Sequence, residues 1–296
     1  MYLIIFLFCD TIRLQGGKEM KETEQQRRER EHQEDLQRLR GFRPMDDDFM
    51  RSLFQRTPKL VELVLRIITE KPDLQVVSFE TQADMKRVTG ARSICLDAYA
   101  TDSTGKKYDI EVQRADRGAS PQRARYHSSV MDVENLDQGQ QFGELPDTYT
   151  IFITEKDFYG EKAPIYRIQR MNLTTGKPFA DGANILYVNG EYRGESDIGL
   201  LMHDFNCTDP EDMKLELMAD CTRYLKESPE GVSQMCREME RMRDKSRAEG
   251  RAEGELLRAR ETAINLHTMG MDVLLIAKAV NVSAEQVRQW LEAVSA

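Results

Sequence analysis

Residues 93–114 read SICLDAYATDSTGKKYDIEVQR, and this stretch decides the fold that the rest of the chain can adopt. Apolar and polar residues alternate on both sides of a central polar segment, which is the period of a β-strand. Within that segment residues 102–106 read DSTGK, and Gly105 stands where a three-residue hairpin loop needs a positive φ. The stretch therefore predicts a β-hairpin.

A loop of residues 103–105 fixes which residues of this hairpin lie opposite each other. One face then carries apolar pairs, and we expect it to point into the core. These pairs are Leu96 with Val112, Ala98 with Ile110, and Ala100 with Tyr108. On the other face Asp97 lies opposite Glu111, and Cys95 lies opposite Gln113.

The facing carboxylates of Asp97 and Glu111 allow two interpretations. Like charges directly opposite each other destabilise a sheet, and a divalent cation between them would relieve the repulsion. Alternatively, both side chains extend into water from a solvated face. The spacing alone leaves both interpretations open.

Composition bounds the classes of protein that the chain can form. A length of 296 residues suits one medium domain with appendages or two small domains. The net charge of −9 argues against a general nucleic-acid coat but leaves room for a local basic groove. The five cysteines form no C-x-x-C pair, which disfavours a zinc cage or a disulfide framework, and we expect each to be a small buried hydrophobe. This usage fits a reducing cytoplasm, so we expect a cytoplasmic protein.

The chain opens with the apolar run MYLIIFLFC at residues 1–9. This run is shorter than the about 20 apolar residues that span a bilayer, and it lacks the flanks of a signal peptide. We expect residues 1–19 to be an upstream extension from a misplaced start, and we expect no stable membrane association. An interpretation as a membrane-tethered factor would rest on residues 2–8 alone.

The segments around the hairpin predict alternating helices and strands. We expect a solvated helix within residues 18–40, a helix from Pro58 whose buried face carries several aliphatic residues, and a helix at about 121–141. Strands are expected at 74–79, 148–154, 165–171 and 184–188. The buried face of the helix from Pro58 consists of Leu60, Val61, Val64, Leu65 and Ile68.

The region from residue 210 onward is expected to be helical. Helices are predicted at 211–226 and 232–247, the near-repeat RAEGRAEGELLRARE favours an extended or coiled-coil-like segment, and residues 261–293 suggest three short helices similar to a helix-turn-helix. The basic residues of its last two helices are Lys278 and Arg288. Two basic residues are few for a helix-turn-helix that binds the major groove of DNA. The alternative is a small helical cap that mediates oligomerisation. The expected domains are an extension at 1–40, a core at 41–209, a helical extension at 210–258 and a small helical tail at 259–296.

An order of helix, strand, hairpin, helix and strand, with an acid on each hairpin arm, resembles the PD-(D/E)XK nuclease core. The chain is similar to the PD-(D/E)XK nuclease family transposases, which are relatives of the recombination-promoting nucleases, over about residues 42–245. The resemblance implies an α/β, restriction-endonuclease-like αβββαβ core with a mixed central sheet, followed by a helical C-terminal tail. The stretches that carry it are LDAYATDSTGKKYDIEVQRADRGASPQRARYHSSVMD, LPDTYTIFITEKDFYG, ILYVNGEYRG and LMHDFNCTDPEDM.

By this resemblance Asp97 is the first motif acid and Glu111 the second. These two carboxylates and the carbonyl of Val112 would bind Mg²⁺ or Mn²⁺, and Gln113 would hold the attacking water. Gln113 stands where the superfamily usually has lysine. Because a neutral amide can only donate and accept hydrogen bonds, the substitution leaves open a slow or inactive enzyme.

Basic residues follow the hairpin and continue into the next helix. They form a candidate phosphate-binding rim for DNA, and a solvated helix face is the alternative. The candidates are Arg114, Arg117, Arg123, Arg125 and Tyr126. We expect His127 and His203 to be ordinary helix or loop histidines, and Asp46, Asp47 and Asp48 to cap a helix rather than bind metal.

These observations predict a Mg²⁺-dependent DNA endonuclease associated with mobile elements or DNA recombination. The alternative is a catalytically weak or inactive nuclease-fold protein that binds DNA or assembles as a homo-oligomer through its C-terminal helices.

Overall fold

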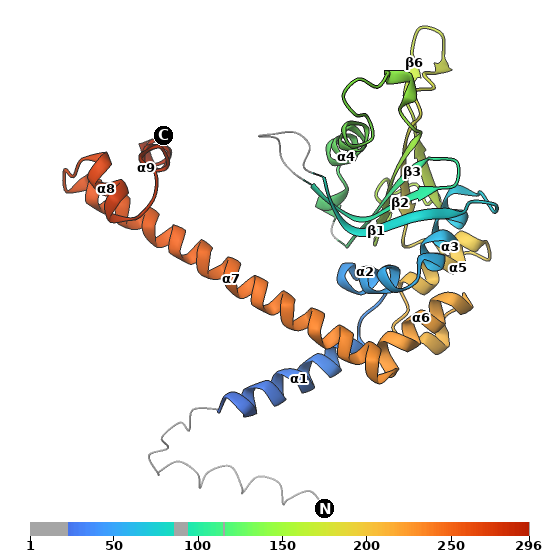
Figure 1. Cartoon of the computed structure of the whole chain (residues 1–296), viewed down its shortest axis with the longest axis horizontal. Coiled ribbons are helices and arrows are strands. Elements are labelled where there is room, and N and C mark those ends of the chain that lie inside the picture. Colours follow the sequence, from blue (N-terminus) through green and yellow to red (C-terminus); the bar gives the residue numbers. More distant parts are fainter. Residues whose placement is uncertain (1–22, 86–93, 115, 296) are drawn as a thin grey trace, which may run out of the picture. The chain divides into compact units, whose positions relative to one another are not determined.

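The structure is a computed structural model that describes residues 23–85, 94–114 and 116–295 (Figure 1). The apolar run at residues 1–9 lies outside the described residues. The chain divides into two compact units, Met1–Val232 and Ser233–Ala296. None of the described helices is both long enough and apolar enough to cross a membrane.

The predicted hairpin is present, with strands β2 (Ile94–Asp102) and β3 (Lys107–Gln113). Its register is the expected one, since Ala98 pairs with Ile110 and Ala100 with Tyr108. Gly105 adopts the positive φ, 86°, that the loop requires.

The buried carboxylate of Asp102 holds the hairpin loop together. It accepts hydrogen bonds from the backbone N–H groups of Thr104 and Lys106, at 2.8 and 3.0 Å, and from the hydroxyl of Tyr108 at 2.7 Å. Burial alone would raise the pKa of Asp102, but the bonds from Tyr108, Thr104 and the Lys106 backbone outweigh it and lower this pKa.

The hairpin lies within a mixed six-stranded sheet of order β1-β2-β3-β4-β8-β5. β1, β2 and β3 are antiparallel, β3, β4 and β8 are parallel, and β5 returns antiparallel to β8. This sheet, with helices between its strands, confirms the expected α/β class. The other strands are β1 (Val76–Met85), β4 (Thr148–Thr154), β5 (Ile165–Ile168) and β8 (Ala183–Asn189).

Helices cover both faces of the sheet (Figure 1). α2 (Asp47–Arg56) and α3 (Pro58–Thr69) pack on β1, and α4 (Pro121–Glu134) packs on β4 and β8 across the sheet. The five aliphatic residues expected on the inner face of α3 are all buried, which confirms that prediction. Each such side chain contributes about 1.5–3 kcal/mol through burial. α5 (Asp197–Phe205) packs on α3, and α6 (Glu216–Glu227) packs on α2.

Several element boundaries differ from those predicted. β1 runs on to Met85 because backbone pairing with β2 carries it through the polar residues after Phe79. α4 ends at Glu134, where the side chain of Asn135 bonds the carbonyl of Met131. The strand expected at 165–171 divides into β5 and the short β6 (Met171–Asn172), which pairs with β7 (Lys177–Pro178).

The helices that flank the core differ from prediction mainly in their length. α6 begins at Glu216 rather than 211, since a 3₁₀ turn occupies Pro210–Asp212. The helix predicted at 232–247, the near-repeat segment and the first of the three short helices form one continuous helix, α7 (Pro229–Thr268). The predicted solvated helix is α1 (Glu24–Arg40), which is mostly exposed.

The second unit ends in two short helices, α8 (Val273–Ala279) and α9 (Ala284–Ser295). Ile276, Val287 and Trp290 pack together with Ala263 of α7 in a small apolar cluster. Of the three short helices predicted at 261–293, the last two are present, whereas the first is part of α7.

The cysteines that the structure describes differ in their burial. Cys221 is buried as expected, whereas Cys95 is exposed, so the expectation of a buried hydrophobe is wrong at that position. Cys95 lies on the face of β2 that is opposite the apolar pairs and that carries mostly polar residues.

We predict that Asp102→Ala lowers the free energy of unfolding by about 2–4 kcal/mol, because it removes several charge-assisted hydrogen bonds, one of them from the buried hydroxyl of Tyr108. Since the pKa of Asp102 is lowered, this contribution is present at neutral pH and is lost in acid as the pH falls through that pKa. Chemical denaturation monitored by circular dichroism measures it. The exposed carboxylate of Asp73 provides the control, and equal losses for Asp102→Ala and Asp73→Ala would contradict the assignment.

Candidate active site

Regular pairing within the hairpin ends at Asp97. Ala98 and Ile110 form the last pair of the β2–β3 ladder before it. Beyond that pair, the backbone N–H of Asp97 donates to Oε1 of Glu111 at 3.0 Å. A side chain therefore takes the place of a ladder hydrogen bond, and the Glu111 carboxylate lies beside the backbone of Asp97.

β1, the strand on the other side of β2, is also irregular beside Asp97. Thr81 pairs with Ala98 and Ala83 with Leu96, and Gln82 between them has a left-handed φ of 56°. Residues other than glycine adopt this conformation rarely, and surrounding structure must hold them there. Asp97 thus lies where β2 departs from regular pairing on both sides.

Four carboxyl groups gather around this point, and we call them the acidic cluster: Asp47, Asp97, Asp109 and Glu111. Burial and repulsion from Glu111 raise the pKa of Asp97 to about 8. Burial and repulsion from Asp109 raise the pKa of Glu111 to about 8 as well. Burial raises the pKa of Asp109 well above its ordinary value, and burial also raises the pKa of Asp47. Asp97 and Glu111 therefore hold protons at neutral pH unless a cation replaces them.

Helix α4 brings two side chains, Arg123 and His127, against the acidic cluster. Nη2 of Arg123 lies 2.8 Å from Oε2 of Glu111. Nδ1 of His127 lies 2.9 Å from Oδ2 of Asp109 and 3.8 Å from Oε1 of Glu111. The expectation that His127 is an ordinary histidine is wrong, because its buried ring is bonded to an acid of the candidate site.

The contacts of His127 define its tautomer. Nε of Arg123 donates to Nε2 of His127 at 3.2 Å, so Nε2 carries a lone pair and the proton lies on Nδ1, where it faces Asp109. Burial lowers the pKa of His127, and the Arg123 charge lowers it further against the attraction of Glu111. His127 is therefore a neutral imidazole that donates to Asp109.

Asp109 and His127 escaped the prediction although weak signals for both were present. Asp109 precedes Glu111 by two residues, which places both on one face of β3. His127 follows Arg123 by four residues, which places both on one face of a helix. Local sequence patterns do not show that α4 packs against β3, and it is this contact that brings the two pairs together.

Gln113 lies on the same face of β3 as Glu111, and its amide packs against Gly118. A Cβ atom at Gly118 would lie 1.8 Å from Oε1 of Gln113. The 3₁₀ turn Asp116–Ala119, which contains this glycine, therefore limits where the Gln113 amide can point.

Some side chains of the candidate phosphate-binding rim are exposed, and others already contact residues of the protein. Arg123 is engaged by Glu111 and His127, although its side chain is 40% exposed. Arg125 is exposed and Tyr126 is half-buried on α4. The side chain of Arg117 lies outside the part of the structure that is described.

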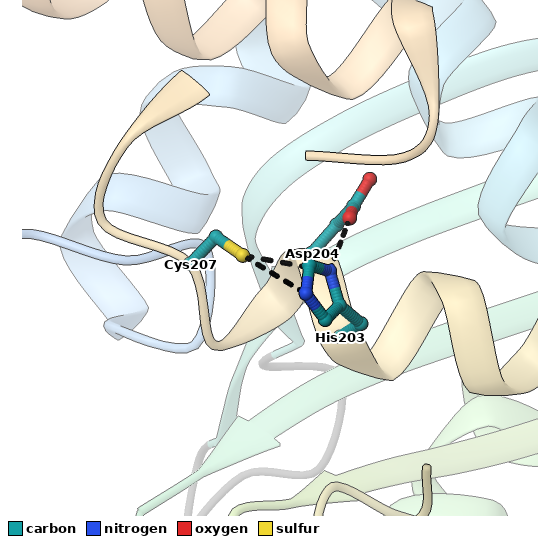
Figure 2. Close-up of side chains that lie close together, drawn as sticks. All are labelled: His203, Asp204 and Cys207. Carbon is teal, nitrogen blue, oxygen red and sulfur yellow. Dashed lines mark hydrogen bonds and ion pairs between the residues drawn. The ribbon is translucent and has the colours of Figure 1, made fainter. Parts of the chain in front are cut away.

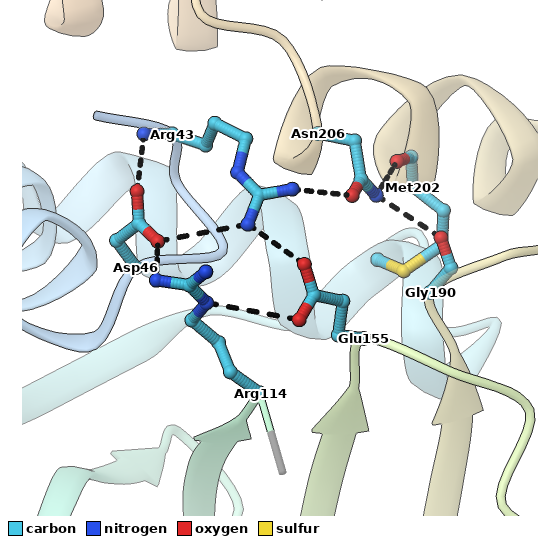
Figure 3. Close-up of polar contacts among 7 residues, drawn as sticks. All are labelled: Arg43, Asp46, Arg114, Glu155, Gly190, Met202 and Asn206. Atoms are coloured by element: carbon cyan, nitrogen blue, oxygen red, sulfur yellow. Dashed lines mark hydrogen bonds and ion pairs between the residues drawn. The ribbon is translucent and has the colours of Figure 1, made fainter. Parts of the chain in front are cut away.

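Arg114 belongs to a polar network at the carboxyl ends of β3 and β4 (Figure 3). Nη1 of Arg114 lies 2.8 Å from Oδ1 of Asp46, and Nη2 of Arg43 lies 2.7 Å from Oε1 of Glu155. Asp46 also accepts a bond from the backbone N–H of Arg43 and makes no side-chain cap to α2, so the capping expectation is wrong for Asp46. The network joins the start of α2 to the end of the strand that carries Gln113.

A known protein family is similar to the part of the chain that contains this site. Residues 54–191 match the family model described as PD-(D/E)XK nuclease family transposase. Over this segment the chain is similar to that family. The match includes the hairpin, α4 and β4, and it confirms the resemblance expected from the sequence. No curated protein and no solved structure gives a significant match to the chain.

The donors of the acidic cluster fit the divalent cations that nucleases of this family generally use. Within the described chain, Oδ1 of Asp47 and Oδ1 of Asp109 are buried and lack a hydrogen-bond partner. Ligand atoms of Asp109, Glu111 and His127 lie within 4.8 Å of one another. Carboxylate oxygens in this number are the ligands that Mg²⁺ and Mn²⁺ prefer.

We predict that, without divalent cations, the wild type loses thermal stability as the pH rises from the ordinary carboxyl range to about 8. The folded state keeps protons on Asp97 and Glu111 up to a pKa of about 8, whereas the unfolded chain releases them near 3.8 and 4.5. Thermal melts in a chelator, and in Mg²⁺ or Mn²⁺, measure this dependence. The cations are expected to restore the melting temperature at high pH.

Asp97→Asn and Glu111→Gln are expected to flatten this pH dependence, because an amide has no proton to lose. Glu80→Gln, which changes an exposed carboxyl group of the same sheet, serves as the control and is expected to melt like the wild type. A wild-type melting temperature that stays constant over this pH range would contradict the raised pKa values.

Proposed function

We propose that the chain is a Mg²⁺- or Mn²⁺-dependent DNA endonuclease associated with mobile elements or DNA recombination, acting in the cytoplasm. The observation that supports this most is the meeting of Asp97 and Glu111 at a break in strand pairing, where each carries a pKa raised to about 8. Buried carboxyl groups in this state bind a divalent cation in exchange for protons.

Asp97, Glu111 and the carbonyl of Val112 are the residues that would hold the ion. The backbone of Val112 lies against the Asp97 carboxylate and lowers its pKa through a hydrogen bond. When bound, the ion lowers the pKa of a water and polarises the scissile phosphate. His127 is a weaker candidate ligand, since its ring nitrogens already face Asp109 and Arg123.

The remaining polar groups orient the ligands and the water. Asp109 and His127 hold α4 against β3, and Arg123 fixes Oε2 of Glu111 so that Oε1 faces Asp97. Gln113 lies on the same strand face and would hold the attacking water by hydrogen bonding. Because an amide cannot take a proton from that water, Gln113 would orient the water without acting as its base.

The DNA backbone would contact the basic residues beside this site. Arg125 is exposed on α4, and Arg114 is 57% exposed although it pairs with Asp46. Together with Arg117, Arg123 and Tyr126 they would position a phosphate without reading sequence.

The second candidate function is a catalytically weak nuclease-fold protein that binds DNA or assembles through its C-terminal helices as a homo-oligomer. It is favoured by the amide of Gln113 and by the net charge of −9. The apolar cluster formed by α7, α8 and α9 provides a separate helical body for such assembly.

We predict that the purified protein nicks or cuts plasmid DNA in Mg²⁺ or Mn²⁺, and that Asp97→Ala and Glu111→Ala each reduce the rate by at least about 1,000-fold, because removing a ligand forfeits several kcal/mol of charge stabilisation. Gel assays of supercoiled plasmid measure the rate. The control is Asp147→Ala, which removes a partly exposed carboxylate that pairs with Lys106 at the opposite end of β4. Equal cleavage by the wild type and all three variants would reject the endonuclease proposal.

We predict that Gly118→Ala lowers the cleavage rate about 100-fold while the protein stays folded. The new methyl group would lie 1.8 Å from Oε1 of Gln113, so the flexible amide must move, and a misplacement of this order costs about 100-fold in rate. The matched control is Gly143→Ala, where a Cβ meets no atom within 4 Å. Equal rates for the two variants would show that the position of the Gln113 amide does not matter.

A further inference from the structure

A second group of ligand-type side chains lies at the C-terminal end of α5, an element that contributes nothing to the acidic cluster. We call His203, Asp204 and Cys207 the α5 cluster (Figure 2). One ligand atom from each lies within 4.8 Å of the others. The proposed nuclease chemistry uses none of these residues.

We propose that the α5 cluster binds Zn²⁺ or a similar transition-metal ion through a ring nitrogen of His203, Oδ1 of Asp204 and Sγ of Cys207. This donor set of nitrogen, oxygen and sulfur is the one that zinc accepts in proteins, whereas Mg²⁺ and Ca²⁺ avoid thiolate. The proposal is independent of the nuclease site.

The separations between the donor atoms suit a tetrahedral ion. Nδ1 of His203 lies 3.0 Å from Oδ1 of Asp204, and Sγ of Cys207 lies 3.5 Å from the same nitrogen. Two ligands with metal bonds of about 2.0–2.3 Å and a tetrahedral angle lie roughly 3.3–3.6 Å apart. The distance to Cys207 falls in this range, and the Asp204 oxygen would move away from His203 by about 0.3 Å. His203 and Cys207 are four residues apart, so the last turn of α5 and the two residues after it place them on one side.

The burial of Asp204 leaves a charge that a cation would balance. Asp204 is fully buried, and its oxygens accept bonds from the backbone N–H groups of Lys214 and Leu215, each at 2.8 Å. Its ion pair is with His203, which is charged only when protonated. A buried carboxylate needs compensation, and carboxylates that bind metals are usually oriented by such N–H donors.

The helix itself adds to the attraction for a cation. His203 lies in the last turn of α5, where the backbone carbonyls create a negative potential. The side chain of His203 is 35% exposed, so an ion and a water ligand can reach the cluster from solvent.

A thiol nucleophile activated by histidine is the competing interpretation of the same residues, and the electrostatics oppose it. Burial and repulsion from Asp204 raise the pKa of the Cys207 thiol, whereas a reactive cysteine needs a lowered pKa. The same negative surroundings favour a metal ion, which displaces the thiol proton when it binds. The bound ion would tie the end of α5 to the start of α6, because Asp204 already holds the backbone there.

The test uses the full-length protein, stripped with a chelator and then loaded with Zn²⁺ or Co²⁺. We expect one zinc ion at the α5 cluster and, with Co²⁺, the intense charge-transfer absorption that a thiolate ligand produces. Cys207→Ser and His203→Ala are expected to abolish the absorption and to weaken zinc binding by more than about 100-fold, beyond the 10–100-fold that loss of a supporting residue costs.

Controls separate the α5 cluster from other binding sites. Cys221→Ser changes a buried thiol that bonds Thr57, and Glu111→Gln alters the acidic cluster, so both variants are expected to keep the cobalt absorption. A wild-type cobalt complex without thiolate absorption would overturn the proposal whether or not the variants fold. Absorption that survives in Cys207→Ser would overturn it equally, and neither result bears on DNA cleavage.

Discussion

The acidic cluster is the constraint on which the rest of the core depends. Asp109 and Glu111 are completely buried on one strand, and Asp97 lies beside them where β2 loses its regular pairing. Carboxylates packed this closely repel each other at a cost that the fold must offset. Protons, the guanidinium of Arg123 or a divalent cation can each do so, and the choice among them is what makes the site responsive to its surroundings.

The parts of the fold that the sequence predicted are those set by local periodicity. The register of the hairpin follows from a strand period of two and from a loop that needs a glycine, so Ala98 and Ile110 could be paired in advance. The buried face of α3 follows in the same way from helical spacing. The family resemblance then added the roles of Asp97 and Glu111, which periodicity alone left open.

The parts that escaped prediction depend on contacts between distant segments. Asp109 and His127 stand 18 residues apart and meet because α4 packs across β3. The length of β1 depends on its pairing with β2, and α6 begins later than predicted because a 3₁₀ turn precedes it. The sequence likewise suggested that Arg114 is available to bind phosphate, yet Arg114 pairs with Asp46 at the start of α2, more than 50 residues earlier in the chain.

The neutral ring of His127 has a mechanical consequence for the molecule. It is bonded on one edge to a strand residue, Asp109, and on the other to Arg123 of its own helix, so it acts as a rigid spacer of fixed width between α4 and the sheet. A flexible side chain of similar polarity would satisfy the same donors at several separations. The planar ring, which is bonded at both nitrogens, restricts that separation more than such a side chain would.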